Sequence, residues 1–300
     1  MKILHCFQWK LNDIRENLNE IKRQGFDMVL TSPLQPHKMT DYNEWFMLYQ
    51  PEGFHVGNDI GSKEDLERLC KDAKEKGLRI MVDIVCNHTA NAGGGELSMI
   101  PSEEVDKELV DNKYFWKPKK IITDWNDRWQ LHNYSIGLPG LDTCNYDLQD
   151  IVVRYLDELI DCGVTGFRFD AARHIGLPSE GCDFFSRVLS NVKRQDLFCM
   201  GEVLNCSPWE IEQYSNINPM MKVLTNVGHG EHNKKVVFAE SHDTFLNTDG
   251  NGYTRHLNED VVVRDYIELC KVYNNVLYYT RPFSNMWKDS RVKYANSINR

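Results

Sequence analysis

The chain has 300 residues, of which 41% are hydrophobic and 26% are charged, a composition typical of a folded chain with a substantial core. Its 44 acidic and 35 basic side chains leave a formal net charge of −9, which argues against a broad phosphate-binding surface and so against nucleic acid as a partner. No stretch approaches the ~20 apolar residues of a membrane helix, so no membrane partner is expected. His5, Gln8 and Lys10 interrupt the start of the chain, where a signal peptide would be apolar. We therefore expect a cytoplasmic protein.

The cysteines support the same expectation. There are nine of them, an odd number, and no two form a CxxC pair. Zinc sites need clustered Cys and His residues at short spacing, and no such cluster is visible. We expect reduced, mostly buried thiols. The cysteines are at positions 6, 70, 86, 144, 162, 182, 199, 206 and 270.

Short apolar runs alternate with amphipathic stretches along the chain. Runs of this length and composition predict buried strands, and their alternation with helices is typical of a parallel sheet. The predicted strands cover residues 3–7, 28–30, 78–85, 164–170, 198–203, 220–224, 235–239 and 276–280.

Four stretches between the strands predict helices. Two of them begin at a serine followed three residues later by an acid, which is the spacing of a capping box or close to it. The others show apolar residues at helical spacing. The predicted helices cover residues 13–24 and 150–162 and begin at Ser62 and Ser207.

Eight strands joined mostly by helices, in a chain of this length, predict an α/β fold of the (β/α)8 or TIM-barrel type. About sixty residues after His88 show little periodicity, which predicts a small domain inserted after the third strand. Trp125 and Trp129 lie in this stretch, and we expect them in the core of the small domain rather than at a binding surface. Residues 225–234 are too few for a sixth crossover helix, and residues 281–300 are too few for a complete last helix. The predicted domains are a barrel, incomplete in these two places, of residues 1–88 and 137–300 and an inserted small domain of residues 89–136.

Polar residues follow the predicted strands where the apolar runs stop. In an eight-stranded barrel these strand ends converge on one face, where active sites lie. Several carboxylates with histidines and an arginine on that face suit glycoside hydrolysis, which needs one carboxylate as nucleophile and one carboxylic acid as proton donor. The residues are Asp83, Asn87, His88, Arg168, Asp170, Glu202, His242 and Asp243.

Five stretches in this order carry a family resemblance. The chain resembles α-amylases of glycoside hydrolase family 13, closest to the bacterial, Bacillus-type members. The stretches are WFMLYQP at 45–51, DIVCNH at 83–88, GFRFDAARH at 166–174, GEV at 201–203 and ESHDT at 240–244.

The resemblance implies three catalytic residues. Asp170 would be the nucleophile that forms a covalent glycosyl intermediate, with Arg168 holding it ionised. Glu202 would be the general acid/base, and Asp243 would stabilise the transition state. The resemblance also implies a set of substrate-binding residues: Phe46, Tyr49, His88, Arg168, Arg173, His174 and His242.

The resemblance further implies a calcium ion that holds the small domain on the barrel. Asn87 and the main chain of His174 match two of its ligands, but Gly140 stands where the family usually has an aspartate. Because calcium prefers six to eight oxygen ligands, the lost carboxylate should weaken the site. No organic cofactor is implied.

Relatives also complete the last helix and carry a C-terminal β-sandwich, neither of which is expected in this chain. The leading interpretation is a monomeric, retaining endo-hydrolase of α-1,4 bonds in starch, glycogen or maltodextrins, whose substrate is an α-glucan or maltooligosaccharide. A related hydrolase or transglycosylase and a catalytically silent glucan-binding homologue remain alternatives. All three catalytic acids are present, which favours an enzyme.

Overall fold

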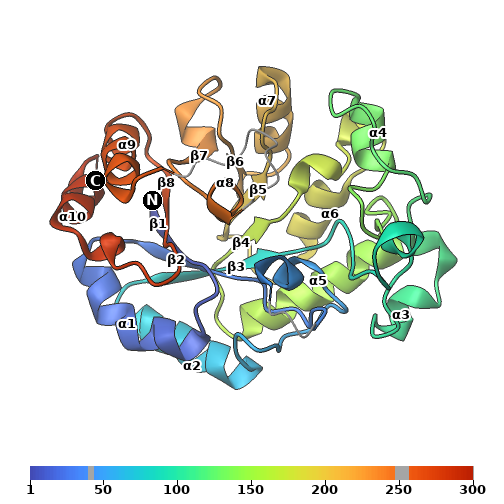
Figure 1. Cartoon of the computed structure of the whole chain (residues 1–300), viewed down its shortest axis with the longest axis horizontal. Helices are drawn as coiled ribbons and strands as arrows, with labels where there is room; N and C mark the ends of the chain where they lie inside the picture. Colours follow the sequence, from blue (N-terminus) through green and yellow to red (C-terminus); the bar gives the residue numbers. More distant parts are fainter. Residues whose placement is uncertain (40–43, 247–256, 300) are drawn as a thin grey trace.

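Eight parallel strands form a closed barrel in the computed structural model, which describes residues 1–39, 44–246 and 257–299. Each strand pairs with the next, and β8 pairs with β1 to close the ring (Figure 1). All eight predicted strands are confirmed, with ends that differ by one or two residues. The strands are β1 (Lys2–Cys6), β2 (Met28–Thr31), β3 (Arg79–Ile84), β4 (Gly166–Phe169), β5 (Phe198–Glu202), β6 (Met221–Leu224), β7 (Lys235–Phe238) and β8 (Val276–Tyr279).

Helices surround the barrel or lie in the segment inserted after β3. Within the described part of the chain, none is long and apolar enough to cross a membrane. The helices are α1 (Leu11–Arg23), α2 (Lys63–Glu75), α3 (Lys107–Val110), α4 (Arg128–Asn133), α5 (Tyr146–Asp161), α6 (Phe184–Asn191), α7 (Pro208–Asn216), α8 (His242–Leu246), α9 (Glu259–Val272) and α10 (Ser290–Ser297).

The predicted helix starts at Ser62 and Ser207 are confirmed, and both are capping boxes. The side chain of Ser62 accepts a hydrogen bond from the backbone of Asp65, whose carboxylate accepts one from the backbone of Ser62. Ser207 and Glu210 make the same reciprocal pair at the start of α7. Each pair satisfies backbone N–H groups that the first turn leaves without partners.

The register of β3, β4 and β5 brings the predicted site residues together. Asp83 on β3 lies opposite Arg168 on β4. Phe169 lies opposite Gly201 on β5, so the residues that follow each of them, Asp170 and Glu202, emerge at the same level. Because all strands are parallel, their carboxyl ends open on one face of the barrel.

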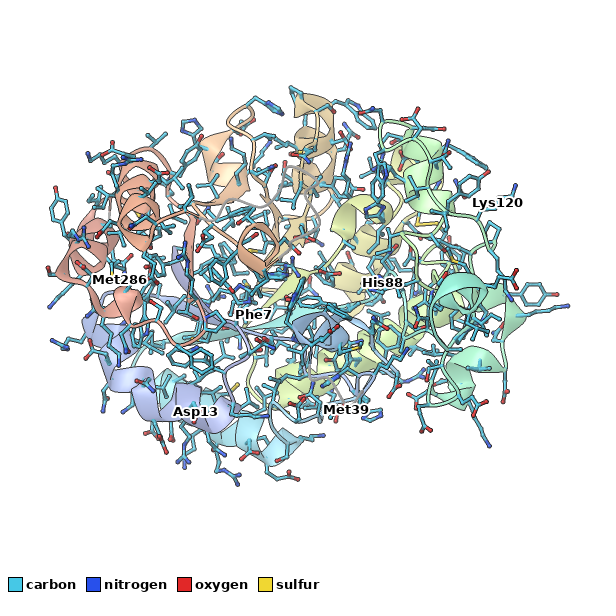
Figure 2. The ribbon with its side chains drawn as sticks, viewed as in Figure 1. Phe7, Asp13, Met39, His88, Lys120 and Met286 are labelled. Atoms are coloured by element: carbon cyan, nitrogen blue, oxygen red, sulfur yellow. A yellow bond between two sulfur atoms is a disulfide. The ribbon has the colours of Figure 1, made fainter. Side chains whose placement is uncertain are left out.

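The segment between β3 and α5 packs with α5 in a second hydrophobic cluster, separate from the main core. In Figure 1 its helices α3 and α4 lie on the opposite side of the barrel from α9 and α10, and the labels in Figure 2 place His88 near the middle of the view and Lys120 at the periphery. This organisation agrees with an insertion after the third strand, while the exact limits of a small domain remain a prediction. The cluster contains Ala90, Val105, Leu109, Phe115, Leu141, Leu148 and Ile151.

The sequence predicts that two helices around the barrel are missing, and the structure confirms only one of these predictions. Between β6 and β7 the structure has one turn of 3-10 helix, His232–Lys234, which confirms that a sixth crossover helix is missing there. The prediction of a missing last helix is wrong, because α10 follows β8. α10 buries Val292 and Ala295, and its Asn296 accepts a hydrogen bond of 2.6 Å from Tyr266 of α9. The sequence of α10 is mostly polar, so its short apolar stripe is weak evidence for a helix.

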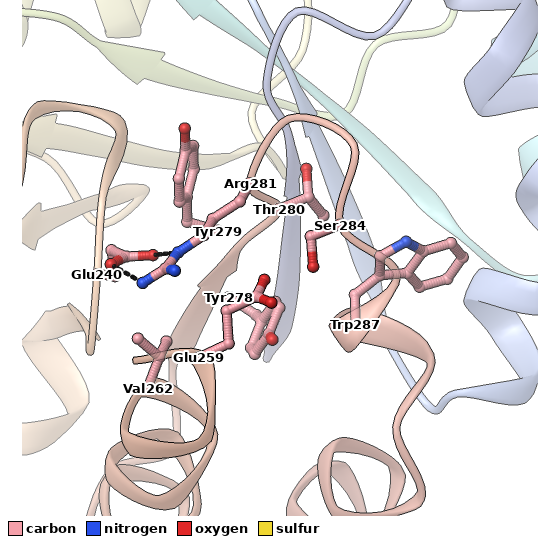
Figure 3. A pocket seen from close by; sticks show the side chains of 9 residues that line it. All are labelled: Glu240, Glu259, Val262, Tyr278, Tyr279, Thr280, Arg281, Ser284 and Trp287. Carbon is pink, nitrogen blue, oxygen red and sulfur yellow. Dashed lines mark hydrogen bonds and ion pairs between the residues drawn. The ribbon is translucent and has the colours of Figure 1, made fainter. Parts of the chain in front are cut away.

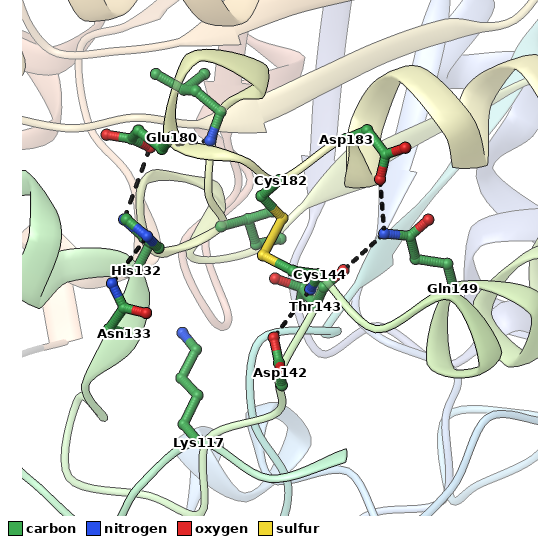
Figure 4. Close-up of a disulfide and its surroundings, with 12 residues drawn as sticks. Lys117, His132, Asn133, Asp142, Thr143, Cys144, Gln149, Glu180, Cys182 and Asp183 are labelled. Carbon is green, nitrogen blue, oxygen red and sulfur yellow. Dashed lines mark hydrogen bonds and ion pairs between the residues drawn. A yellow bond between two sulfur atoms is a disulfide. The ribbon is translucent and has the colours of Figure 1, made fainter. Parts of the chain in front are cut away.

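One expectation about the cysteines is also wrong. Cys144 and Cys182 form a disulfide that joins the start of α5 to the start of α6 (Figure 4). The two residues are 38 positions apart, so only the packing of α5 beside α6 brings them together, and no local motif predicts the pair. The other seven cysteines are buried free thiols, as expected of small hydrophobic residues in a core.

Candidate active site

The carboxyl ends of the strands open into a cleft of about 530 Å³. Nine of the ten residues predicted as catalytic or substrate-binding line this cleft, although they come from distant parts of the chain. The fold therefore brings the predicted site together on the face where barrel enzymes have their active sites. The nine are Phe46, Tyr49, His88, Asp170, Arg173, His174, Glu202, His242 and Asp243.

Arg168 is the exception, because it lies beneath the cleft and is only 1% exposed. Its Nη1 donates to both carboxylate oxygens of Asp83, at 2.9 and 2.8 Å, and to Oδ1 of Asp170 at 2.8 Å. Its Nη2 donates to Oε1 of Glu202 at 2.6 Å. The sequence predicts Arg168 as a substrate-binding residue, but its guanidinium is committed to these three acids. It is therefore a positioning residue that holds the acids in place.

The three acids carry more negative charge than one guanidinium balances. Burial raises the pKa of Glu202 to about 7, although the positive charge of Arg168 opposes this. Burial also raises the pKa of Asp83 to about 7 and that of Asp170 above its ordinary value, and Arg168 opposes both shifts. Because the acids interact, the cluster as a whole holds protons close to neutral pH. Such a site can supply a carboxylic acid as proton donor.

The backbone between the two central acids is unusual. Ala171, which follows Asp170, has a φ of 49°, in the left-handed region. In this conformation its N–H donates to Oε2 of Glu202 at 3.2 Å. A non-glycine residue in this region costs ~1 kcal/mol or more, and such strain gathers at functional sites. The strained turn and Arg168 together fix both oxygens of Glu202.

His242 and Asp243 enter the cleft at the start of α8. The His242 ring stacks between Phe7 and Tyr49, with ring centroids 4.9 and 5.0 Å away. Burial lowers the pKa of His242 to about 3, so the ring is neutral at pH 7. Its Nε2 lies 3.4 Å from Oδ2 of Asp243. The negative charge of Asp243 helps to raise the pKa of Asp170, and both side chains line the cleft.

Two aromatic residues predicted to face a sugar differ in exposure. Tyr49 is buried and its hydroxyl donates to Oδ2 of Asp83 at 3.0 Å, which fixes the ring at the edge of the cleft. Phe46 is 37% exposed and lines the cleft without such a bond. Both remain candidates for stacking on a sugar ring.

Three more predicted residues already have protein partners. Nε2 of His88 is 2.8 Å from the carbonyl oxygen of Tyr49. Nε of Arg173 donates to Glu210 at 2.8 Å. Nδ1 of His174 is 3.3 Å from a backbone oxygen of α4. These bonds orient the side chains toward the cleft, and their roles in substrate binding remain predictions.

The expected calcium ligands do not fit a metal ion. Oδ1 of Asn87 and the carbonyl oxygen of His174 both accept hydrogen bonds from Nζ of Lys117, at 2.9 and 3.0 Å. Gly140 adds no side-chain oxygen. Burial lowers the pKa of Lys117 to about 7, and the negative charge of Asp142 opposes this shift. The amino group of Lys117 therefore occupies the position that a cation bound to the oxygens of Asn87 and His174 would need.

Other cleft residues are not evident from the sequence. Trp125 and Trp129 are predicted as small-domain core, and this is wrong, since they are 51% and 57% exposed. Trp125 lines the cleft and packs edge-on against His174, with ring centroids 5.6 Å apart. A tryptophan in a stretch without periodicity gives no signal of which way it faces. Further lining residues are Trp45, Gln50, Ile136, Leu138, Ala171 and Leu204.

Glu240 belongs to the support of the barrel rather than to the cleft. Its two carboxylate oxygens accept hydrogen bonds from Nε and Nη2 of Arg281, both at 2.7 Å (Figure 3). This pair joins the segment after β7 to the segment after β8. The sequence favours a position of Glu240 on the barrel exterior or against a neighbouring strand, and the pairing with Arg281 agrees with the second of these.

A parallel barrel with acids grouped around an arginine at the carboxyl ends of its strands is an arrangement suited to the paired carboxylic acids of glycoside hydrolases. Residues 9–229 match the family model described as the α-amylase catalytic domain. The chain belongs to the α-amylase family.

Curated relatives agree with this family. The chain is 30% identical to an α-amylase of Clostridium acetobutylicum, over 99% of this chain and 43% of that protein. It is 25% identical to an α-amylase of Butyrivibrio fibrisolvens, over 93% of this chain and 34% of that protein. The chain thus spans less than half the length of these two relatives.

Solved structures show the same fold. The α-amylase I of Eisenia fetida superimposes with a TM-score of 0.78 at 18% identity, covering 98% of this chain and 77% of that chain. The α-amylase of Geobacillus thermoleovorans, solved with acarbose, gives a TM-score of 0.75 at 17% identity, covering 98% of this chain and 77% of that chain.

Proposed function

We propose that the chain carries a retaining endo-hydrolase activity on α-1,4-glucosidic bonds, with starch, glycogen or maltodextrins as substrates. The observation that carries the proposal is the Arg168 cluster, in which one guanidinium holds two acids, Asp170 and Glu202, at the floor of the cleft. The elevated pKa of Glu202 suits a proton donor, and Asp170 is the neighbouring candidate for the nucleophile. Two relatives support the substrate class, since one was solved with maltohexaose and another with acarbose.

In the first step, an oxygen of Asp170 attacks the anomeric carbon while Glu202 gives its proton to the departing glycosidic oxygen. The C–O bond to the leaving glucan breaks as the bond to Asp170 forms. In the second step, ionised Glu202 takes a proton from water, whose oxygen displaces Asp170 from the same carbon. Two displacements return the starting configuration. Asp243 would stabilise the positive charge that develops on the sugar.

The direct test is cleavage of a maltoheptaoside blocked at its non-reducing end. The chain should release internal fragments, and the Glu202→Gln variant should lose this activity while keeping the fold. Turnover that is equal in the native chain and the variant would contradict the proposal. A native chain that binds the glucan without cleaving it would favour the silent homologue.

A transglycosylase is the second candidate, because a cyclomaltodextrin glucanotransferase superimposes with a TM-score of 0.74. The chemistry differs only in whether water or a sugar hydroxyl displaces Asp170. Incubation with maltotetraose decides between them, since products longer than the substrate require transfer. The monomeric state and the cytoplasmic location remain predictions.

The rate should depend on the protonation of Glu202. Because a general acid works only while it holds its proton, a pKa of about 7 predicts that kcat/KM falls about tenfold for each pH unit above pH 7. A pH profile of kcat/KM on the blocked maltoheptaoside measures this fall. A profile that stays flat to pH 9 would show that Glu202 is not the titrating acid.

Trp125 should contribute to glucan binding. Replacing it with alanine removes an exposed ring at the cleft, which we expect to raise KM about five- to tenfold while kcat stays within about twofold. Trp129→Ala is the matched control, because Trp129 is similarly exposed but does not line the cleft. Equal KM values for the two variants would show that Trp125 does not contribute to glucan binding.

A further inference from the structure

We propose that the side-chain amino group of Lys117 takes the place of the structural cation in this chain, so that the inserted segment is held on the barrel without calcium. The proposal concerns how the site is assembled and is independent of the reaction that the cleft carries out.

Lys117 connects three segments of the chain: the insertion, the loop after β3 and the loop after β4. It lies in the insertion, and its side chain is buried. Its Nζ donates to Oδ1 of Asn87 at 2.9 Å, in the loop after β3, and to the carbonyl oxygen of His174 at 3.0 Å, after β4. One group therefore joins the insertion to two loops that also supply His88 and Asp170 to the cleft.

Lys117 and calcium exclude each other at this position. Calcium binds its oxygens at about 2.3–2.6 Å and takes six to eight of them. Both oxygens of Asn87 and His174 that match the family's ligands already accept hydrogen bonds from Nζ of Lys117. A dication placed at the same oxygens would also be repelled by the amino group of Lys117 whenever that group is protonated.

The glycine at position 140 leaves room for the Lys117 side chain, which supports the replacement of the metal by the lysine. A Cβ atom at position 140 would lie 3.0 Å from Cδ of Lys117 and 2.7 Å from Oγ of Ser135. The lysine side chain thus fills the space that a side chain at position 140 needs. The backbone N–H of Lys117 also donates to the carbonyl oxygen of Gly140 at 2.9 Å. A glycine in place of the usual aspartate removes a carboxylate, and the amino group of Lys117 donates to the two oxygens that the metal would bind.

The first experiment measures metal dependence in the native chain. Purified protein should contain far less than one calcium per chain by elemental mass spectrometry, and its melting temperature should differ by less than about 1 °C between EDTA and millimolar calcium. A stoichiometric calcium ion, or a melt that EDTA lowers by several degrees, would overturn the proposal. Neither readout requires enzymatic activity.

The second experiment removes the amino group. Lys117→Met keeps most of the apolar stem but leaves two buried oxygens without a donor, so its melting temperature should fall by about 3–8 °C. Lys119→Met is the matched control, an exposed lysine two residues away, and should melt within about 1 °C of the native chain. A Lys117→Met variant as stable as its control would overturn the proposal.

The third experiment restores the metal site. The double variant Lys117→Ala/Gly140→Asp removes the lysine amino group and places a carboxylate in the space that the lysine side chain occupied. The hydroxyl of Ser135, which lies near position 140, can rotate to make room. We expect the double variant to bind calcium and to melt several degrees higher with calcium than with EDTA, unlike the native chain. A double variant that remains indifferent to calcium would show that these oxygens are no cation site and would contradict the exchange.

Discussion

Replacing Asp170 with asparagine should abolish glucan hydrolysis, with kcat falling by about 10⁴-fold or more while glucan binding persists. The amide has almost the same shape as the carboxylate, so the variant removes the nucleophile and leaves the cleft. Arg168 keeps its bonds to Asp83 and Glu202, which should preserve the fold. The measurement compares single-turnover cleavage of the blocked maltoheptaoside with retardation of the folded variant in a glycogen-containing native gel.

The control for this variant is Asp196→Asn, which changes an exposed acid outside the cleft and should leave kcat unchanged. If Asp170→Asn hydrolyses the glucan at the wild-type rate, Asp170 is not the nucleophile. Loss of both cleavage and glycogen binding, with the melt unchanged, would show that Asp170 acts in substrate binding instead.

Replacing Arg168 with methionine should have the largest effect on stability. The variant leaves Asp83, Asp170 and Glu202 buried without their shared counter-charge. Breaking a buried ion pair by removing one partner typically costs about 3–5 kcal/mol of unfolding free energy. Urea denaturation of the native chain and the variant measures this loss.

The loss should also depend on pH. Without the guanidinium, the folded-state pKa of the three acids rises further above its unfolded value, so the folded variant binds more protons than the unfolded chain. Its stability is then highest at low pH and is lost as pH rises. The gap from the native chain should widen between pH 5 and pH 8. A gap that narrows would contradict the charge argument.

Arg187→Met is the control for Arg168→Met. Arg187 pairs with Asp150 at the surface at 2.7 Å, and exposed pairs contribute about 0–1 kcal/mol. Equal losses in the two variants would show that burial of the Arg168 cluster adds nothing to stability.

Local patterns predicted the barrel well. Each strand is a short apolar run, and the serine–acid spacing at Ser62 and Ser207 identified two helix starts. Features that depend on packing between distant segments were missed. The polar helix α10 becomes visible only through its buried face against α9, and Cys144 meets Cys182 only because α5 lies beside α6.

The candidate site shows the same division. Acids at strand ends could be predicted, because parallel strands bring their carboxyl ends to one face. The direction of a side chain within an irregular insertion could not, which is why Trp125 was placed in a core and Lys117 was overlooked. The pairing of Arg168 with Asp170 was expected, but its bond to Glu202 becomes evident only from the register of β4 and β5.

Trapping of the glycosyl intermediate tests the central claim most directly, namely that Asp170 and Glu202 carry out a double displacement. The chain would be incubated with a 5-fluoro-α-glucosyl or α-maltosyl fluoride, whose slow second step lets the intermediate accumulate. Intact-mass and peptide analysis should find one glycosyl group, attached at Asp170, and none in Asp170→Asn. Turnover of the glucan without an adduct, or an adduct on another residue, would contradict the account.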